Sequence, residues 1–211
     1  MSDTPKPTRR RPGRPTGQRP PEQETRTRIL HAAADLFRLR GYAAVSIGEI
    51  ATAVGVTKPT LYYHFSGKEA IYAAVMCWTL ETIAEGVWVI ARLPGSIRER
   101  LLLLAQAGLE HAPTDADLTP MMRDVATHLN PELHAGIAAA HEATLAAFDG
   151  VMRSGMDVGE LRAREPRFLA HAYLHQLEAL INRPDLSRDE KYHALKDMVD
   201  LFLDGAAARD R

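Results

Sequence analysis

The chain has 211 residues, of which 45% are apolar and 25% are charged, so it is long enough for one or two globular domains. Its only cysteine, Cys77, lies among apolar residues, which excludes an internal disulfide and fits a small buried side chain in a reducing compartment. The formal net charge of −1 conceals an asymmetry. Residues 1–70 hold twelve Lys/Arg against six Asp/Glu, whereas residues 71–211 hold fourteen against twenty-one. A basic front half on an acidic body predicts that the front half meets a polyanion.

No segment is predicted to cross or enter a membrane. The basic N-terminus has no apolar stretch behind it, as a secretory signal would need. The apolar segment from Ile71 is interrupted by Glu81 and Glu85, which argues against a membrane span. A cytoplasmic protein is therefore expected.

Residues 1–21 contain six prolines and seven charged residues and almost no large apolar side chain, so a disordered basic arm is predicted. Its RRRPGRPTGQR sequence resembles an AT-hook, in which arginines such as Arg11 and Arg14 enter a narrow A·T-rich minor groove. Non-specific attraction to phosphates explains the same composition. Both interpretations stay open.

After this arm the chain lacks strand-like alternation, and an all-α protein is predicted. The first helix is expected over residues 22–39, with Gly41 ending it. Ser46 and Glu49 form a capping box for a short second helix, because the hydroxyl and the carboxylate can each accept a backbone N–H of the other residue. Gly55 ends that helix.

Thr57 is expected to cap a third helix with Pro59 in its first turn, where the missing N–H is not needed. A further capping box, Ser66 with Glu69, is expected to open a long fourth helix that reaches about Arg92.

Five more helices are predicted, which gives about nine in all. They are a helix from the Ser96–Glu99 box to about His111, one over about 115–129, one over about 131–156 capped by Asn130, one over 166–181, and one from the Ser187–Glu190 box to about 206.

The second and third helices, joined by a glycine-containing turn, form a helix-turn-helix pattern. On a 3.6-residue period, Leu61 and Phe65 share an apolar face that can pack inward. Thr60, Tyr63 and His64 share another face. A short helix with an apolar back and a front of hydroxyls, rings and amines is suited to the major groove of DNA.

The stretch from about Thr25 to Tyr72, above all SIGEIATAVGVTKPTLYYHFSGKEAIYAAV, resembles the DNA-binding domain of the tetracycline-repressor (TetR) family of bacterial transcription regulators. The order G-V-x-x-x-x-L-Y-x-H-F-x-x-K-E-x-L is specific to that family, although Ile71 stands where Leu is usual. The resemblance implies that residues 22–70 are the DNA-binding domain and that the third helix is its recognition helix. It assigns DNA contact to Ser46, Ile47, Lys58, Thr60, Tyr62, Tyr63, His64 and Lys68.

Four of these assignments have alternatives, and Tyr63 and His64 could be ordinary surface residues. Tyr62 could pack against the first helix and offer only its hydroxyl, and Lys68 could be an ordinary solvated charge. Gly48 departs from the family pattern, in which larger polar residues often stand at this position, so one contact is expected to be missing.

The resemblance also implies that residues 71–211 form an effector-binding and dimerisation domain, with a small-molecule pocket between the fourth and seventh helices. Methionine and aromatic lining would suit an apolar or amphipathic effector, although each candidate could equally be core. The pocket candidates are Trp78, Thr82, Trp88, Met121, Met122, Val125, His128, Phe148, Met152 and Tyr173.

The family pairs its last two helices in a homodimer, and each of these helices carries an apolar stripe at helical spacing here. The stripes are Leu169, Tyr173, Gln176, Leu177 and Leu180 on one helix, and Leu195, Met198, Val199 and Phe202 on the other. A two-fold dimer would present two recognition helices about one turn of DNA apart, so a palindromic operator is expected. The effector would release this operator, which makes the protein a ligand-responsive repressor.

The alternatives come from other classes. A helical metal-dependent enzyme could use His171, His175 and Glu178, with His128 and His134 nearby, but no third ligand is fixed by the spacing. Structural or solvated histidines are favoured, and no metal, cofactor or catalytic residue is predicted. A purely structural helical scaffold would leave the basic arm and the Tyr-Tyr-His sequence unexplained.

Overall fold

The computed structural model describes residues 22–111 and 131–206, and this part of the chain forms eight helices and no strand. The helices are α1 (Glu22–Ala44), α2 (Ile47–Val54), α3 (Lys58–His64), α4 (Lys68–Ala91), α5 (Ile97–His111), α7 (Pro131–Asp157), α8 (Pro166–Ile181) and α9 (Arg188–Ala206). The all-α prediction is confirmed. The basic arm and the helix expected over 115–129 lie outside the described residues.

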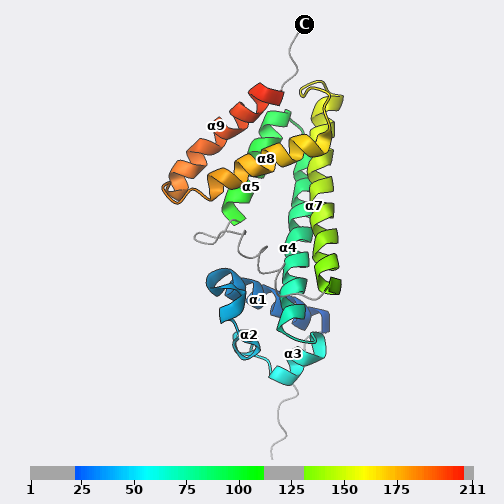
Figure 1. The fold of residues 1–211 in the computed structure, drawn as a ribbon, viewed down its shortest axis with the longest axis vertical. Coiled ribbons are helices and arrows are strands. Elements are labelled where there is room, and N and C mark those ends of the chain that lie inside the picture. The colour runs from blue at the N-terminus through cyan, green and yellow to red at the C-terminus, as the bar shows by residue number, and fades with distance from the viewer. Residues whose placement is uncertain (1–21, 112–130, 207–211) are drawn as a thin grey trace, which may run out of the picture.

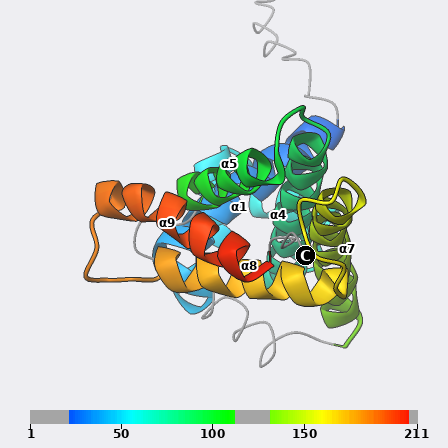
Figure 2. The same cartoon turned by 90° about the horizontal axis from the view of Figure 1, so that it is seen from above.

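The molecule is elongated, and α4 and α7 run side by side along its length (Figure 1). Helices α1, α2 and α3 gather at one end of α4. At the other end, α8 packs on α7 and α9, and α5 packs on α9, as the view from above also shows (Figure 2).

Two hydrophobic cores follow one another along this axis. The first is formed by α1, α2, α3, the beginning of α4 and Ile137 of α7. The second is formed by the remainder of α4 with α5, α7, α8 and α9. Helix α4 contributes Ile71 and Tyr72 to the first core and Ala84 and Val87 to the second, so it links the two.

Most of the predicted caps are present. In α2, the Ser46 hydroxyl accepts the Glu49 N–H at 3.2 Å, and the Glu49 carboxylate accepts the Ser46 N–H at 2.8 Å. The boxes at Ser96 and Ser187 show the same two bonds. The box predicted at Ser66 is wrong: the residue that precedes α4 is Gly67, and no side chain caps that helix.

The end of α1 is longer than predicted. Helical structure continues to Ala44, but Gly41 interrupts it with a φ of 74°, a conformation that glycine adopts without a steric penalty. The sequence therefore located the break correctly but not the extra turn that follows it.

The two apolar stripes proposed as a dimer surface are mostly buried within the chain's own core. Leu169, Tyr173 and Leu177 of α8 are buried in the second core. All four stripe residues of α9 are buried in the same core. These side chains are thus used to hold α8 and α9 against α5 and α7, and only the opposite faces of α8 and α9 are left for a partner.

Helix α4 is long and apolar enough to cross a membrane when judged by length and composition alone, so Glu81 and Glu85 do not exclude a span as the sequence argument held. A core helix of a globular protein passes the same test. In the fold, α4 packs against α1, α5 and α7 and links the two cores, and 28% of the apolar window is buried.

Candidate nucleic-acid interface

Helix α3 is a short helix held at both ends. The Thr57 hydroxyl accepts the Thr60 N–H at 3.4 Å, and Pro59 occupies the first turn. Leu61 and Phe65 are buried in the first core, as predicted. The helix therefore has one anchored face, which fixes the direction of the others.

The outward faces of α3 carry aromatic rings. Tyr62 is 55% exposed and Tyr63 is 72% exposed, so the alternative that Tyr62 packs in the core is wrong. The Tyr63 and His64 rings meet edge to face with centroids 5.2 Å apart. Thr60 is half-buried, with its hydroxyl 2.9 Å from that of Thr57. The structure thus brings Thr60, Tyr63 and His64, which were predicted to share one face, together on the short helix α3.

The turn between α2 and α3 is built from backbone bonds. Gly55 adopts a left-handed conformation with a φ of 73°, and its N–H bonds to the Thr52 carbonyl at 3.1 Å. The Val56 N–H bonds to the Ala51 carbonyl at 3.0 Å. Arg28 of α1 donates to the Val54 carbonyl at 2.7 Å, which ties the end of α2 to α1.

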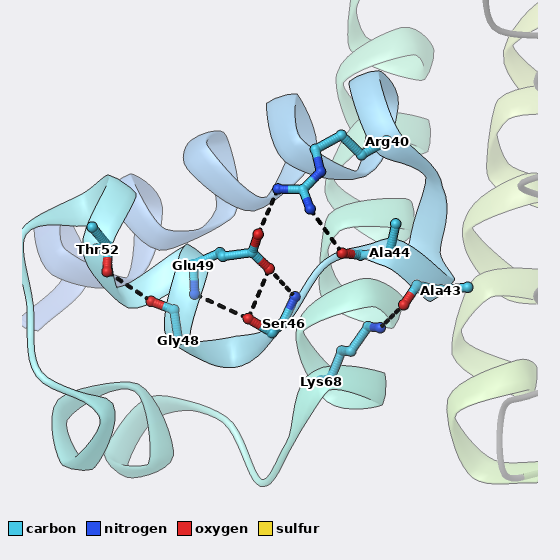
Figure 3. Close-up of polar contacts among 8 residues, drawn as sticks. All are labelled: Arg40, Ala43, Ala44, Ser46, Gly48, Glu49, Thr52 and Lys68. Carbon is cyan, nitrogen blue, oxygen red and sulfur yellow. Dashed lines mark hydrogen bonds and ion pairs between the residues drawn. The ribbon is translucent and has the colours of Figure 1, made fainter.

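The start of α2 is fixed by a polar network around Glu49 (Figure 3). One carboxylate oxygen of Glu49 accepts bonds from the backbone and hydroxyl of Ser46, and the other accepts one from Arg40 at 2.6 Å. Arg40 also donates to the Ala44 carbonyl at 3.0 Å. The hydrogen bond from Ser46, and to a smaller extent the one from Arg40, lowers the pKa of Glu49 to about 2. The Glu49 carboxylate is therefore charged and bonded within this network. Ser46 is exposed and Ile47 is half-buried beside it.

Lys68 lies at the same junction, but its amine is already engaged. It donates to the Ala43 carbonyl at 3.2 Å (Figure 3) and sits 4.2 Å from the centroid of the Tyr42 ring. Burial lowers the pKa of Lys68. In this conformation Lys68 connects the first turn of α4 to the last turn of α1.

Lys58, by contrast, is exposed at the N-terminal end of α3. A further cation that the sequence argument missed is Arg26 of α1, whose guanidinium carbon lies 5.1 Å from the centroid of the Phe65 ring. Arg26 is exposed next to the C-terminal end of α3. No local pattern could have found it, because the start of α1 and the end of α3 meet only in the fold.

The effector-pocket candidates that the structure describes separate into two groups. Phe148, Met152 and Tyr173 are packed in the second core, and the Tyr173 hydroxyl donates to the Leu101 carbonyl at 2.6 Å. Burial raises the pKa of Tyr173. Trp78, Thr82 and Trp88 lie along α4 in less buried positions. Met121, Met122, Val125 and His128 lie outside the described residues.

The candidates on α4 make individual contacts. Trp78 packs on His31 of α1 with ring centroids 4.6 Å apart. The Thr82 hydroxyl donates to the Trp78 carbonyl at 2.8 Å. The Trp88 ring lies so close to Gly150 of α7 that a Cβ there would be 2.7 Å away. Trp88 also lines a shallow depression of about 370 Å³, together with Glu85, Val89 and Arg92.

The histidines of α8 lie on its exposed side. The rings of His171 and His175 stack with centroids 5.9 Å apart, and the His175 Nδ1 is 3.5 Å from the Glu178 carboxylate. Within residues 22–111 and 131–206, no group of three or more His, Cys, Asp or Glu side chains is arranged to hold a metal ion.

Helix α3 is anchored by its buried face, the turn at Gly55 sets it against α2, and its tyrosine rings point outward. Together these features define a helix-turn-helix DNA-binding protein. Residues 29–75 match the family described as "Bacterial regulatory proteins, tetR family". The HTH-type transcriptional activator FasR of Mycolicibacterium smegmatis is 34% identical over 152 residues, which cover 71% of this chain and 69% of that protein. The chain belongs to the TetR family of transcription regulators.

Solved structures agree on the fold. The regulator FadR from Bacillus subtilis, in complex with stearoyl-CoA, superposes with a TM-score of 0.69 at 19% identity, over 85% of this chain and 98% of that one. AibR, in complex with isovaleryl coenzyme A and operator DNA, gives 0.61 at 23% identity, over 82% and 97%. TetR-family regulators are not enzymes, so the metal-dependent enzyme alternative is unsupported.

Proposed function

We propose that the protein is an effector-responsive regulator that places α3 in the major groove of an operator duplex. The main support for this proposal is the orientation of α3, in which Leu61 is buried while Tyr62 and Tyr63 are exposed. Large rings left in solvent on a helix this short gain nothing from folding, but their hydroxyls suit phosphate oxygens and their edges suit bases. The protein acts on DNA in the cytoplasm.

The proposed contacts combine the residues of α2 and α3 with cations around them. Ser46 and Ile47 contact phosphates from the start of α2, and Arg26 adds a phosphate contact beside Phe65. Lys68 reaches a phosphate only by leaving the Ala43 carbonyl, so its first role is to position α4. The contacts from α3 are Lys58, Thr60, Tyr62, Tyr63 and His64, and the arm adds Arg11 and Arg14.

A homodimer is proposed to form through the outer faces of α8 and α9. These faces expose Phe168 (65%) and Leu201 (68%), whereas their inner faces are filled by the second core. Exposed apolar side chains of this size support a protein interface. A two-fold dimer whose α3 helices are about 34–36 Å apart would read a palindromic operator.

The effector is proposed to be apolar or amphipathic and to bind in residues 71–211, among the helices of the second core. Because α4 is shared by both cores, a ligand that changes its packing against α5 and α7 would tilt the DNA-binding end as well. An effector that binds more tightly to a conformation with misplaced α3 helices lowers the operator affinity. The reduction equals the difference in its binding free energy between the two conformations, and the result is derepression. The acyl-CoA complexes of FadR and AibR make long-chain and branched short-chain acyl-CoAs the first compounds to test.

A second candidate for the transcriptional outcome is activation, because the relative FasR is an activator by name. The two outcomes share the DNA-binding step and differ in what the bound dimer does to transcription. A promoter–reporter fusion carrying the operator separates them: deleting the regulator raises the signal of a repressor's target and lowers that of an activator's target.

The DNA-binding step is tested by selecting duplexes from a random pool with the wild-type protein and then titrating the selected duplex by fluorescence anisotropy. We expect an inverted repeat with half-sites about one helical turn apart, and an affinity that falls linearly on a log–log plot against salt. The proposal would be contradicted if no sequence were enriched over the starting pool, or if the affinity did not depend on the salt concentration. Adding stearoyl-CoA or isovaleryl-CoA to the complex then tests effector release.

A further inference from the structure

Gly48 stands in the first turn of α2 without a conformational reason to be glycine. The described glycines with positive φ are Gly41, Gly55, Gly95 and Gly159, and Gly48 is not among them. Inside a helix, glycine is less favourable than alanine by about 1 kcal/mol. A glycine with ordinary helical angles therefore calls for a packing explanation.

The neighbour that uses the space is Lys58 of α3. A Cβ built on Gly48 would lie 3.0 Å from the Lys58 Cε and 3.4 Å from its Nζ. The Ser46 hydroxyl oxygen would be 3.8 Å away. The end of the Lys58 side chain thus lies against the first turn of α2 at Gly48.

The ammonium of Lys58 remains available to an anion. The nearest acidic residue in sequence, Glu49, is held by Ser46 and Arg40. The ion pairs found in the described part of the chain do not include Lys58, and its side chain is exposed. A cation in solvent at the front of a DNA-binding motif is free to neutralise a phosphate.

We propose that Gly48 is a positioning residue, because the room it leaves lets Lys58 lie against α2 and place its ammonium on a backbone phosphate of the operator. The inference rests on the proposed DNA-binding function.

The test is a double-mutant cycle on the duplex selected by the wild-type protein. Gly48→Val fills the space with a side chain that has no donor, and Lys58→Met keeps a stem of similar length without the charge. The wild type, the two single variants and the double variant are titrated by anisotropy between 0.05 and 0.3 M salt, a range of about sixfold in which phosphate contacts are read from the slope. Gly86→Val is the matched control, because Gly86 is a helical glycine of α4 with nothing within 4 Å of its Cβ position.

One phosphate contact contributes a slope of about −0.9, which amounts to about an eightfold change in affinity at 0.1 M salt. We expect Lys58→Met and Gly48→Val each to lose about this factor and about one unit of slope. The double variant should be no weaker than Lys58→Met, since the glycine matters only through the lysine. Gly86→Val should bind as the wild type does, and reselection with Lys58→Met should recover the same sequence.

Other results overturn the inference. An unchanged affinity in Gly48→Val, or losses that multiply in the double variant, would show that Gly48 does not act through Lys58. A reselected sequence that differs at one base pair would show that Lys58 reads a base instead of a phosphate. If thermal unfolding shows that Gly48→Val is not folded, Gly48→Ala replaces it, with an expected loss of about twofold that is absent in the Lys58→Met background. Failure of the wild type to bind any duplex overturns the proposed function itself, whereas wild-type binding with no coupling overturns only this inference.

Discussion

Helices α3 and α8, which lie toward opposite ends of the molecule, place their tyrosines in opposite environments. At the α3 end, Tyr62 and Tyr63 project into solvent. At the α8 end, Tyr173 is fully buried, its hydroxyl bonds to the Leu101 carbonyl, and its ring meets Phe202 edge to face at 5.6 Å. The same type of side chain is therefore exposed on α3 and packed in the core on α8.

The difference follows from how each helix is covered. Helix α3 is seven residues long and packs mainly through Leu61 and its capping residue Phe65, so most of its surface stays outside. Helix α8 contacts α5, α7 and α9, and these helices bury the face that carries Leu169, Tyr173 and Leu177. Exposure of a ring is thus decided by whether a neighbouring helix covers its face, and function can be argued only for the rings that the neighbours leave uncovered.

The largest expected effect is at the buried tyrosine. Tyr173→Ala should lower the free energy of unfolding by about 3–5 kcal/mol, because it leaves a cavity the size of an aromatic ring in the second core. Urea denaturation followed by circular dichroism measures the change. Tyr173→Phe should lose only about 1 kcal/mol, since it removes the hydrogen bond but keeps the ring. A loss below 1 kcal/mol for the alanine variant would mean that the second core does not depend on this ring.

The opposite pattern is expected at the exposed ring. Tyr63→Ala should weaken binding to the selected operator by about 1–3 kcal/mol while leaving the free energy of unfolding within about 0.5 kcal/mol. Anisotropy titration and urea denaturation give the two values. Val158→Ala is the control, since Val158 is 66% exposed and follows the end of α7 that lies far from α3 (Figure 1). Wild-type affinity in Tyr63→Ala would remove this ring from the interface.

Lys68 could either stabilise the fold or contact DNA, and a substitution separates these two roles. Because its amine bonds to the Ala43 carbonyl and faces the Tyr42 ring, Lys68→Met should lower the free energy of unfolding by about 1 kcal/mol in the absence of DNA. Urea denaturation detects this loss. If stability is unchanged while the salt slope of operator binding falls by about one unit, Lys68 is a phosphate contact and not a structural link.

The smallest effect concerns the pH dependence of the network at Glu49. The folded state holds the pKa of Glu49 at about 2, below the usual 4.5, so the stabilisation it provides is complete above about pH 4.5 and is lost as the pH falls toward 2. Glu49→Gln should therefore have a lower Tm than the wild type at pH 6, and this difference should shrink as the pH approaches 2. Differential scanning calorimetry across that range measures it. A constant difference at all pH values would show that the charge of Glu49 is not what stabilises α2.

The sequence located the local features of the fold and of the candidate interface. The capping boxes at Ser46, Ser96 and Ser187 were predicted because each joins two residues three apart within one helical turn. The inward direction of Leu61 and Phe65 followed from their spacing of four. The missing cap at Ser66 shows that the pattern permits a box without enforcing one, since the chain enters α4 through Gly67.

What the sequence by itself determined is the class of the chain, the order of its helices and the identity of the helix that presents its rings, because these depend on interactions within one or two turns. Only the tertiary structure decided that the apolar stripes of α8 and α9 face their own core, that Lys68 is engaged by Ala43, and that Lys58 lies against Gly48. Each of these depends on which surfaces of distant helices come together. Many apolar faces of similar width can satisfy the same periodicity, and the choice among them is made by the packing of the whole chain.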